Sequence, residues 1–380
     1  MRTIARAAAV TFTVALAAAA ISASPADAAV PTAADHGGDH VVFVQTDDPA
    51  GNRVVAYDRH ADGTLTFEHS YATGGLGGVL TGSVVDHLAS QGSLAYDSRH
   101  ALLYAVNAGS DSVSVFAVHG DRLRLRQVAA SDGTFPVSIA VHGDAVYVLN
   151  ARDGGSVQGF VTAGGHLLSV AGWHRALGLD PTQTPEFTHT PGQVAVSTNG
   201  RWLVVTTKGN GSAIDVFALN RFGRPSTTPT VNVEPGAVPF AVTFDAHGTL
   251  VVAEAGTNAV QTFSIGSDGG LTSLSSLGTG QAATCWVVRD GSRLFLSNAG
   301  SANLTGVGTG AGGKLSLLGQ TATDAGTVDA AVSAGGHFLY VQTGATGAVD
   351  AFAVHADGSL TAVGSVLVPD AVGGEGIVAT

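Results

Sequence analysis

The sequence predicts an all-β protein, a seven-bladed β-propeller with four-stranded blades. Three observations predict this fold. Gly supplies 52 of the 380 residues, 45% of the residues are hydrophobic and only 12% are charged, which favours short apolar strands and tight turns over helices. One pattern of strands and turns is repeated seven times along the chain. The period of this pattern is about 45 residues, which is typical of propeller blades.

The first segment, residues 1–28, has the pattern of a secretory signal peptide. Two arginines precede an uncharged stretch from Ala7 to Ile21, and Ala26-Asp27-Ala28 has the small-residue form of a cleavage site. The stretch is shorter than the ~20 residues that span a bilayer, and no later stretch approaches that length. We therefore expect a secreted protein without a membrane span in the mature chain, with a flexible leader at 29–40 and a single propeller domain at 41–380.

The charge and cysteine content narrow the class of protein further. The predicted signal contains two of the 17 Lys and Arg and one of the 29 Asp and Glu, so the remainder carries 15 against 28, a formal charge of −13. An acidic surface disfavours nucleic acid and anionic membranes as partners. Cys285 is the single cysteine, so no intramolecular disulfide can form. We expect a monomer whose stability comes from a large apolar core.

Seven repeated units follow one another from residue 41 onward. Each contains an apolar strand, a polar turn, a strand with a central apolar marker that is aromatic in six units, a Gly or Asp turn and a short outer strand, as in LLYAVNAGSDSVSVFAVHGDRLRL from Leu102. Successive markers are 59, 44, 57, 46, 44 and 45 residues apart. The markers are Tyr57, Phe116, Phe160, Phe217, Phe263, Val307 and Phe352. Alternating apolar and polar residues along these segments indicate β-strands.

A further apolar strand precedes six of the units and should be the innermost strand of each blade. These strands begin at Gly92, Pro136, Pro191, Pro239, Thr284 and Val328. The first unit lacks one, whereas GGEGIVAT, from Gly373 to Thr380, follows the seventh unit where an innermost strand is due. We therefore expect the C-terminal strand to complete the N-terminal blade. Such closure removes the exposed sheet edges of an open ring.

Two connections between blades are longer than the others. The first insertion, Gly74 to Gln91, and the second insertion, Arg175 to Thr190, account for the spacings of 59 and 57 residues. Both should lie on the face where the turns between second and third strands surround the central channel. Loops at such a place commonly carry function. Surface loops also lengthen at little energetic cost without acquiring any role.

Three segments resemble a known family. They are the LLYAVNAGSDSVSVFAV form of the repeat, GQVAVSTNGRWLVVTTKGNGSAIDVFALNRFGRP, and GQAATCWVV from Gly280. Together they resemble the lactonase-like seven-bladed propellers, which include 6-phosphogluconolactonases and carboxymuconate cyclases, and GQAATCWVV resembles an exported subgroup. The resemblance implies the propeller fold over the whole mature chain, and lactonase or cyclase activity. The family's His, Arg and Glu set has no complete match here, so no catalytic residue is transferred from it.

Candidates for lactone chemistry lie in and near the second insertion. Hydrolysis of a lactone needs a base that activates water and a donor that stabilises the developing oxyanion. His189 is the candidate base, and Arg152 or Lys208 is the candidate donor for the carboxylate or oxyanion. Glu186, in the same insertion, is a candidate for substrate binding. Most of the 14 His residues lie in turns, where a structural role is the simpler interpretation.

Other polar residues could line a ligand site. Asn107, Asn150 and Glu254 occupy equivalent positions, each at the end of a strand beside a turn. An Asn at such a place also commonly hydrogen-bonds its own turn. Gln281 and Trp286 come from the GQAATCWVV motif and complete the candidate substrate-binding set. The position of Trp286 suits either the core between sheets or the lining of the channel.

Two classes of function are compatible with the sequence. One is an enzyme that opens or forms a small-molecule lactone at the mouth of the channel. The other is a non-catalytic extracellular propeller that binds a protein, peptide or glycan through the two insertions. No cofactor is expected. No metal site is expected either, because the metal-dependent lactonases with Glu, Asp and Asn ligands are six-bladed, whereas seven units are present here.

Overall fold

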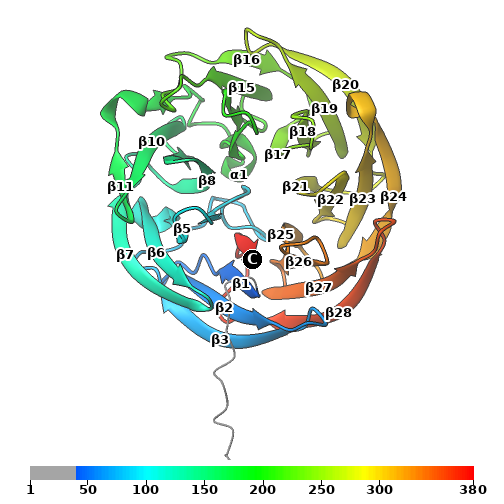
Figure 1. Cartoon of the computed structure of the whole chain (residues 1–380). Helices are drawn as coiled ribbons and strands as arrows, with labels where there is room; N and C mark the ends of the chain where they lie inside the picture. Colours follow the sequence, from blue (N-terminus) through cyan, green and yellow to red (C-terminus); the bar gives the residue numbers. More distant parts are fainter. Residues whose placement is uncertain (1–39) are drawn as a thin grey trace, which may run out of the picture. The chain divides into compact units, whose positions relative to one another are not determined.

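The computed structural model describes residues 40–380, so the predicted signal and almost all of the predicted leader lie outside the described residues. The described residues form seven antiparallel sheets. Figure 1 shows these sheets arranged as the blades of a ring around a central channel. The predicted seven-bladed propeller of four-stranded blades is therefore confirmed. Among residues 40–380, no helix has the length and apolar character needed to cross a membrane.

Each blade contains four strands in sequence order from the channel outward, apart from the closing blade. The innermost strands are β4 (Leu94–Asp97), β8 (Pro136–His142), β13 (Val194–Val196), β17 (Pro239–Phe244), β21 (Thr284–Asp290), β25 (Thr327–Val332) and β29 (Ile377–Ala379). The second strands are β1 (Val41–Gln45), β5 (Leu102–Asn107), β9 (Ala145–Asn150), β14 (Trp202–Thr206), β18 (Leu250–Glu254), β22 (Arg293–Asn298) and β26 (Phe338–Thr343).

The outer half of each blade follows the same order. The third strands are β2 (Arg53–Arg59), β6 (Ser112–His119), β10 (Ser156–Ala163), β15 (Ala213–Ala218), β19 (Ala259–Ile265), β23 (Asn303–Thr309) and β27 (Ala348–Val354). The outer strands are β3 (Leu65–Ala72), β7 (Arg122–Ala130), β11 (His166–Ser169), β16 (Thr230–Val233), β20 (Leu271–Gly278), β24 (Leu315–Ala322) and β28 (Leu360–Leu367). A two-residue strand, β12 (Arg175–Ala176), also pairs with β10.

Within residues 40–380, helical structure is confined to four short segments of the connections. Three are single 3₁₀ turns, and the fourth is a one-turn α-helix in the second insertion. They are η1 (Ala108–Ser110), η2 (Ala171–Trp173), η3 (Ala311–Gly313) and α1 (Glu186–His189).

The C-terminal strand closes the ring as the sequence predicts. β29 pairs antiparallel with β1, so that Phe43 faces Val378 and Val44 faces Ile377. Each innermost strand also contacts the next one around the ring, and β29 contacts both β25 and β4. Figure 1 shows the C-terminus at the centre of the ring. The first and last segments of the propeller therefore belong to one blade, and no sheet edge is left open between neighbouring blades.

The core lies between adjacent blades. The seven repeat markers, which the sequence places in the third strand of each blade, are all almost completely buried. Tyr57, for example, lies in β2 and Phe352 in β27, and each packs with apolar residues of its own and the adjacent blade. Outer strands are mostly exposed, because only one neighbouring strand covers them. Burial of the markers explains why an aromatic or β-branched residue recurs with the period of the blade.

Candidate functional site

The first insertion crosses the central channel. We call residues 80–92 of this insertion the plug. Its side chains Leu80 and Leu88 are fully buried, and the His87 backbone N–H donates to the Gly373 carbonyl at 2.7 Å beside the closing strand. A side chain on Gly344, in the seventh blade, would overlap the Val85 carbonyl, so the plug passes directly against that backbone.

Further bonds tie the plug to the opposite side of the ring. The Trp286 indole N–H donates to the Ser90 carbonyl at 2.7 Å. The Gln91 side chain donates to the Val287 carbonyl and accepts from the Val287 N–H, both at 2.9 Å. Ser90 Oγ donates to the Val137 carbonyl in a third blade. The plug therefore joins strands that are far apart in the sequence and closes one end of the channel.

The second insertion builds an open cavity on the same face. The cavity has a volume of about 170 Å³. Its walls are the turn after β9, the segment from residue 179 to α1, and Asn210 from the turn after β14. Polar and charged side chains at its wall include Arg152, Asp153, Asp180, Glu186, His189 and Asn210. Three residues predicted from sequence, Arg152, Glu186 and His189, are thus brought together.

His189 ends α1, and its hydrogen bonds fix the state of the imidazole ring. Nδ1 lies 2.9 Å from the Pro185 carbonyl and 2.9 Å from Thr188 Oγ1. A carbonyl oxygen only accepts, so Nδ1 carries the proton in the neutral ring and Nε2 has the free lone pair. Nε2 lies beside Gly209, where a Cβ would approach it to 3.2 Å. His189 therefore lies at the wall of the cavity, with Nδ1 bonded within α1 and Nε2 beside the Gly209 backbone.

Arg152 and Glu186 form a bidentate ion pair across the cavity. Nε of Arg152 lies 2.6 Å from Oε1 of Glu186, and Nη2 lies 3.2 Å from Oε2. The guanidinium also stacks on Phe135, with its carbon 4.2 Å from the ring centroid. Among residues 40–380, no partner is found for Nη1 of Arg152. The hydrogen bond from Arg152 lowers the pKa of Glu186 to about 2, so the pair is ionised at neutral pH.

Lys208 lies behind the cavity and is only 1% exposed. Its ammonium donates to the Ala89 carbonyl of the plug at 2.7 Å, to the Phe187 carbonyl at 2.6 Å and to Thr190 Oγ1 at 3.0 Å. Burial lowers the pKa of Lys208 to about 7. All three N–H donors of the ammonium are used, so none is left for a substrate. The geometry therefore makes Lys208 a positioning residue that joins the two insertions rather than the oxyanion donor that we expected.

The predicted Asn and Glu positions do not converge on this cavity. Asn107 and Asn150 are fully buried within their blades. Asn107 donates to Ser112 and Ser114 at the start of the next strand, which confirms the alternative that it bonds its own turn. Glu254 is 3% exposed and accepts from Thr257 in its own turn at 2.9 Å. Their burial leaves these three side chains no surface for a ligand.

The two residues from the GQAATCWVV motif also lie elsewhere. Gln281 accepts from the Asn303 amide at 2.6 Å, in the sixth blade. Trp286 is 4% exposed, packs edge-to-face on Phe240 with ring centroids 5.0 Å apart, and holds the plug through its indole N–H. Burial raises the pKa of the neighbouring Cys285 thiol to about 12, so it carries no reactive thiolate at neutral pH.

Sequence reasoning missed a set of buried carboxyl groups around the plug. Asp86 accepts backbone N–H bonds from three following residues of the plug, each at 2.9 Å. Glu375 accepts from the Gly92 N–H at 2.8 Å, and Asp47 accepts from the Glu375 N–H at 2.8 Å. Burial raises the pKa of Asp47 to about 8, of Asp86 to about 7 and of Asp329 to about 6. Asp47, Asp86 and Glu375 lie outside the strands, in connections where the repeat pattern gives no signal.

Within residues 40–380, no three His, Cys, Asp or Glu side chains are arranged so that they could hold a metal ion. The cavity of the second insertion instead combines an oriented imidazole, a guanidinium with an unused edge and several carboxylates. An imidazole with a free lone pair can take a proton from water, and a guanidinium can hold an oxyanion. The arrangement therefore suits chemistry on a small, electrophilic carbonyl compound.

Comparison with solved structures shows which fold the chain shares with known proteins. No protein-family model and no curated protein sequence matches the chain. A protein from Lactobacillus plantarum matches with 20% identity and a TM-score of 0.69, and the match covers 89% of this chain and 98% of that one. The chain has the fold of the lactonase-like seven-bladed propellers, in agreement with the resemblance of its repeats.

Two further structures connect this fold to lactones by their names. A candidate 6-phosphogluconolactonase from Bacteroides fragilis matches with 18% identity and a TM-score of 0.68. The periplasmic gluconolactonase of Pseudomonas aeruginosa matches with 17% identity and a TM-score of 0.67. Each match covers 89% of this chain and 98% of the other chain. Identities at this level establish a shared fold and leave activity to be argued from the site.

Proposed function

We propose that the protein is an exported lactone hydrolase whose active site is the cavity of the second insertion. The observation that carries this proposal is the orientation of His189: Nδ1 is held by the Pro185 carbonyl, which leaves Nε2 as a base at the cavity wall. A cavity of about 170 Å³ suits a small lactone without long substituents. The gluconolactonase with the same fold supports the choice of substrate class.

The proposed reaction adds one water molecule across the ring ester. Water attacks the lactone carbonyl carbon while His189 Nε2 takes its proton, and Nη1 of Arg152 holds the oxyanion. The ring C–O bond then breaks, and the leaving alkoxide takes the proton from His189. The product is a hydroxy acid, which releases a proton to solvent. Glu186 keeps the guanidinium in place, and Lys208 holds α1 against the plug.

The proposal is tested by proton release from a panel of γ- and δ-lactones, with and without a chelator. Turnover that is unaffected by the chelator is expected, and His189→Ala should lower kcat/KM by roughly 10²- to 10⁴-fold, the usual contribution of a general base. His166→Ala is the matched control, because His166 Nδ1 also lies against a carbonyl, at 3.1 Å, on the exposed outer strand β11. Equal losses in both variants, or no loss in either, would remove His189 from the mechanism.

Export is part of the same proposal. The signal-like residues 1–28 and the periplasmic location of one protein with this fold support it. N-terminal sequencing of the protein recovered outside the cytoplasm should begin at Ala29. Recovery of the chain in the cytoplasm with Met1 intact would contradict export without affecting the proposed chemistry.

A binding role is the second candidate function. Three apolar side chains are exposed in segments close to the plug, with exposed fractions of 43% for Leu76, 75% for Val84 and 60% for Val372. Exposed apolar groups near one another are typical of interaction surfaces. Absence of turnover across the lactone panel, together with peptide or glycan binding that Val84→Asp abolishes, would favour this role over hydrolysis.

A further inference from the structure

A second, larger groove lies on the face opposite the insertions. Its volume is about 610 Å³, and it lies between the third and fourth blades. Turns that join innermost to second strands, and third to outer strands, form its walls; such turns lie at the opposite end of the strands from the insertions. Two of these turns are residues 142–145 and 199–201, and a third is residues 219–223.

Aromatic rings form one side of this groove. Tyr147 and Trp173 stack with centroids 6.0 Å apart and planes 15° from parallel. Phe222, at the tip of a turn, is 68% exposed. Gly223 lets the turn at residues 219–223 pack closely on Trp173, since a Cβ on Gly223 would lie 3.0 Å from the Trp173 ring. Tyr147 is fully buried and Trp173 is 7% exposed, so Phe222 is the ring that the groove offers to a ligand with a flat face.

The charged groups of the groove leave it electropositive. Among residues 40–380, neither Arg201 nor Arg221 lies within ion-pair distance of a carboxylate. The guanidinium of Arg221 lies 4.5 Å from the Phe222 ring centroid, and that of Arg201 lies 5.7 Å from Trp202. Asp144 is the one acidic residue in the groove wall, and Arg99 and His100 already pair with it, at 3.4 and 3.3 Å.

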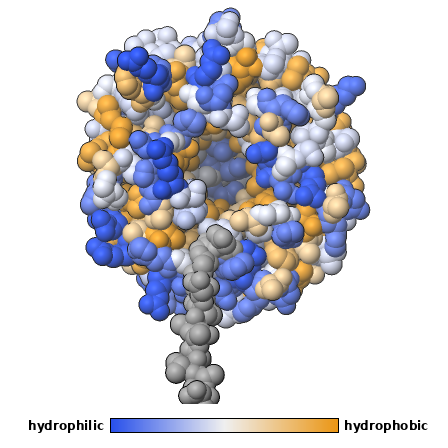
Figure 2. Space-filling view, in the orientation of Figure 1, coloured by the Kyte–Doolittle hydropathy of each residue, from blue (hydrophilic) through white to orange (hydrophobic). Residues whose placement is uncertain are grey.

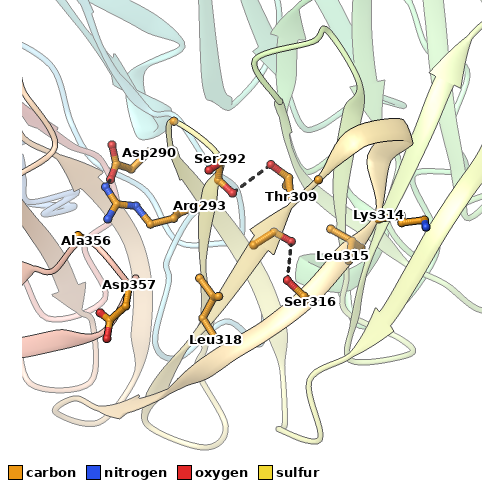
Figure 3. Close-up of a pocket in the computed structure, with 13 residues that line it drawn as sticks. Asp290, Ser292, Arg293, Thr309, Lys314, Leu315, Ser316, Leu318, Ala356 and Asp357 are labelled. Carbon is orange, nitrogen blue, oxygen red and sulfur yellow. Dashed lines mark hydrogen bonds and ion pairs between the residues drawn. The ribbon is translucent and has the colours of Figure 1, made fainter.

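A groove between the sixth and seventh blades provides a contrast (Figure 3). Its volume is similar, about 760 Å³, but no aromatic residue lines it. Figure 3 shows the Arg293 side chain directed at Asp290, with which it forms an ion pair. Asp357 faces the same groove, so the charges there are balanced. Free guanidinium groups beside an exposed ring are thus a feature of the first of these two grooves.

We propose that the groove between the third and fourth blades binds an acidic oligosaccharide, a chain of uronic acid sugars. The flat C–H face of a pyranose ring matches the exposed ring of Phe222, and sugar carboxylates match the two-pronged geometry of Arg201 and Arg221. The whole chain carries a formal charge of −12, which repels any polyanion, so we expect the local attraction to come from the two guanidinium groups of the groove. The groove is separate from the proposed lactone site and needs no catalysis.

Isothermal titration of the full protein with an oligogalacturonate tests the proposal. Binding is expected to weaken with salt, and to be lost when the same oligosaccharide is methyl-esterified and uncharged. Arg221→Gln and Phe222→Ala should each weaken binding by about tenfold, whereas Lys314→Gln, in the charge-balanced groove, should not. Wild-type melting temperature in each variant would show that folding is intact.

Several outcomes would overturn the proposal. Equal binding of the esterified and free oligosaccharides would exclude recognition of the carboxylates. Absence of binding, or an equal effect of Lys314→Gln, would exclude this groove. Tighter binding of a single-stranded oligonucleotide than of the oligogalacturonate would identify a nucleic acid surface instead.

Discussion

The two insertions are similar in length and lie on one face, but they use their polar groups differently. The first directs backbone and side-chain polar groups into the ring, where Ser90 and Gln91 bond other blades. The second keeps Arg152, Glu186 and His189 at the wall of an open cavity. Figure 2 shows the ring hollowed at its centre, with hydrophilic surface inside. One insertion therefore closes the channel, and the other provides a place for a ligand beside it.

On this face of the ring, we therefore expect the first insertion to contribute to stability and the second to function. The polar side chains of Asp86, Ser90 and Gln91 in the plug are bonded by other groups of the protein, so their loss should unfold or loosen the ring. Groups of the cavity are partly exposed, so their loss should change chemistry with little effect on stability. Lys208 joins the two insertions, because its ammonium donates to a carbonyl of each.

The largest effect on stability is expected from Asp86→Ala. The change leaves the Leu88 and Ser90 N–H groups without an acceptor and the Ala89 N–H with only the backbone carbonyl of residue 86, and we expect a loss of about 3 kcal/mol in the free energy of unfolding. Asp86→Asn keeps one acceptor oxygen and should lose less. Asp180→Ala is the matched control, because Asp180 also accepts local N–H bonds but is exposed, in the second insertion. Denaturant unfolding measures all three, and equal losses would contradict the division between the insertions.

Lys208→Met should have the next largest effect. Methionine keeps the apolar length of the side chain but leaves Ala89 O, Phe187 O and Thr190 Oγ1 without their donor. We expect a loss of about 2 kcal/mol, and a fall in lactone turnover because α1 is no longer fixed to the plug. Unchanged stability and turnover in this variant would show that the two insertions do not depend on each other.

Stability should also fall as the pH rises from about 4 to about 8. Burial raises the folded-state pKa of Asp47 to about 8, of Asp86 to about 7 and of Asp329 to about 6, all from 3.8. In this window the folded protein holds more protons than the unfolded chain, so raising the pH favours unfolding. Below about pH 6.5, the lowered pKa of His87 opposes this loss of stability. Above about pH 7, the lowered pKa of Lys208 opposes it.

The melting temperature should therefore be higher at pH 5 than at pH 7.5. Asp47→Asn should reduce the difference, because it removes the group with the highest of these three pKa values. A melting temperature that rises over this interval would show that the carboxyl groups around the plug are not protonated in the folded protein.

The smallest of these effects is expected from Trp286→Phe. Phenylalanine keeps an aromatic ring against Phe240 but cannot donate to the Ser90 carbonyl. We expect a loss of about 1 kcal/mol in the free energy of unfolding, the usual contribution of one such bond. Phe240→Leu, which alters the packing but leaves the indole bond, distinguishes lost packing from the lost hydrogen bond. A loss in Trp286→Phe no larger than the experimental error would mean that this bond does not hold the plug.

The repeat made the fold predictable from the sequence. A marker such as Phe116 or Phe263 recurs because each blade buries the same position, and strand closure follows from a missing and a supernumerary strand. The face of the insertions also followed from the order of the strands. Every blade repeats the same short sequence pattern, so a single sequence is enough to reveal it.

Among the candidate site residues, proximity was visible in the sequence only for those that are neighbours in the chain, whereas Arg152 was named without any sign that it meets them. Glu186 and His189 share α1, and their common place was visible in the sequence. The bond between Trp286 and Ser90 joins residues 196 apart, and no local pattern indicates it. The N–H groups of Lys208 are likewise occupied by backbone carbonyls of loops, and no sequence pattern indicates such contacts. Long-range contacts of irregular loops thus decided the parts that sequence reasoning missed.

The most direct test of the account measures lactone turnover and melting temperature together in wild type and His189→Ala. We expect a fall of at least about 100-fold in kcat/KM with a nearly unchanged melting temperature, because His189 lies at the wall of the cavity and does not hold the plug. An unchanged kcat/KM in a folded variant would contradict the central claim that the second insertion carries the reactive base.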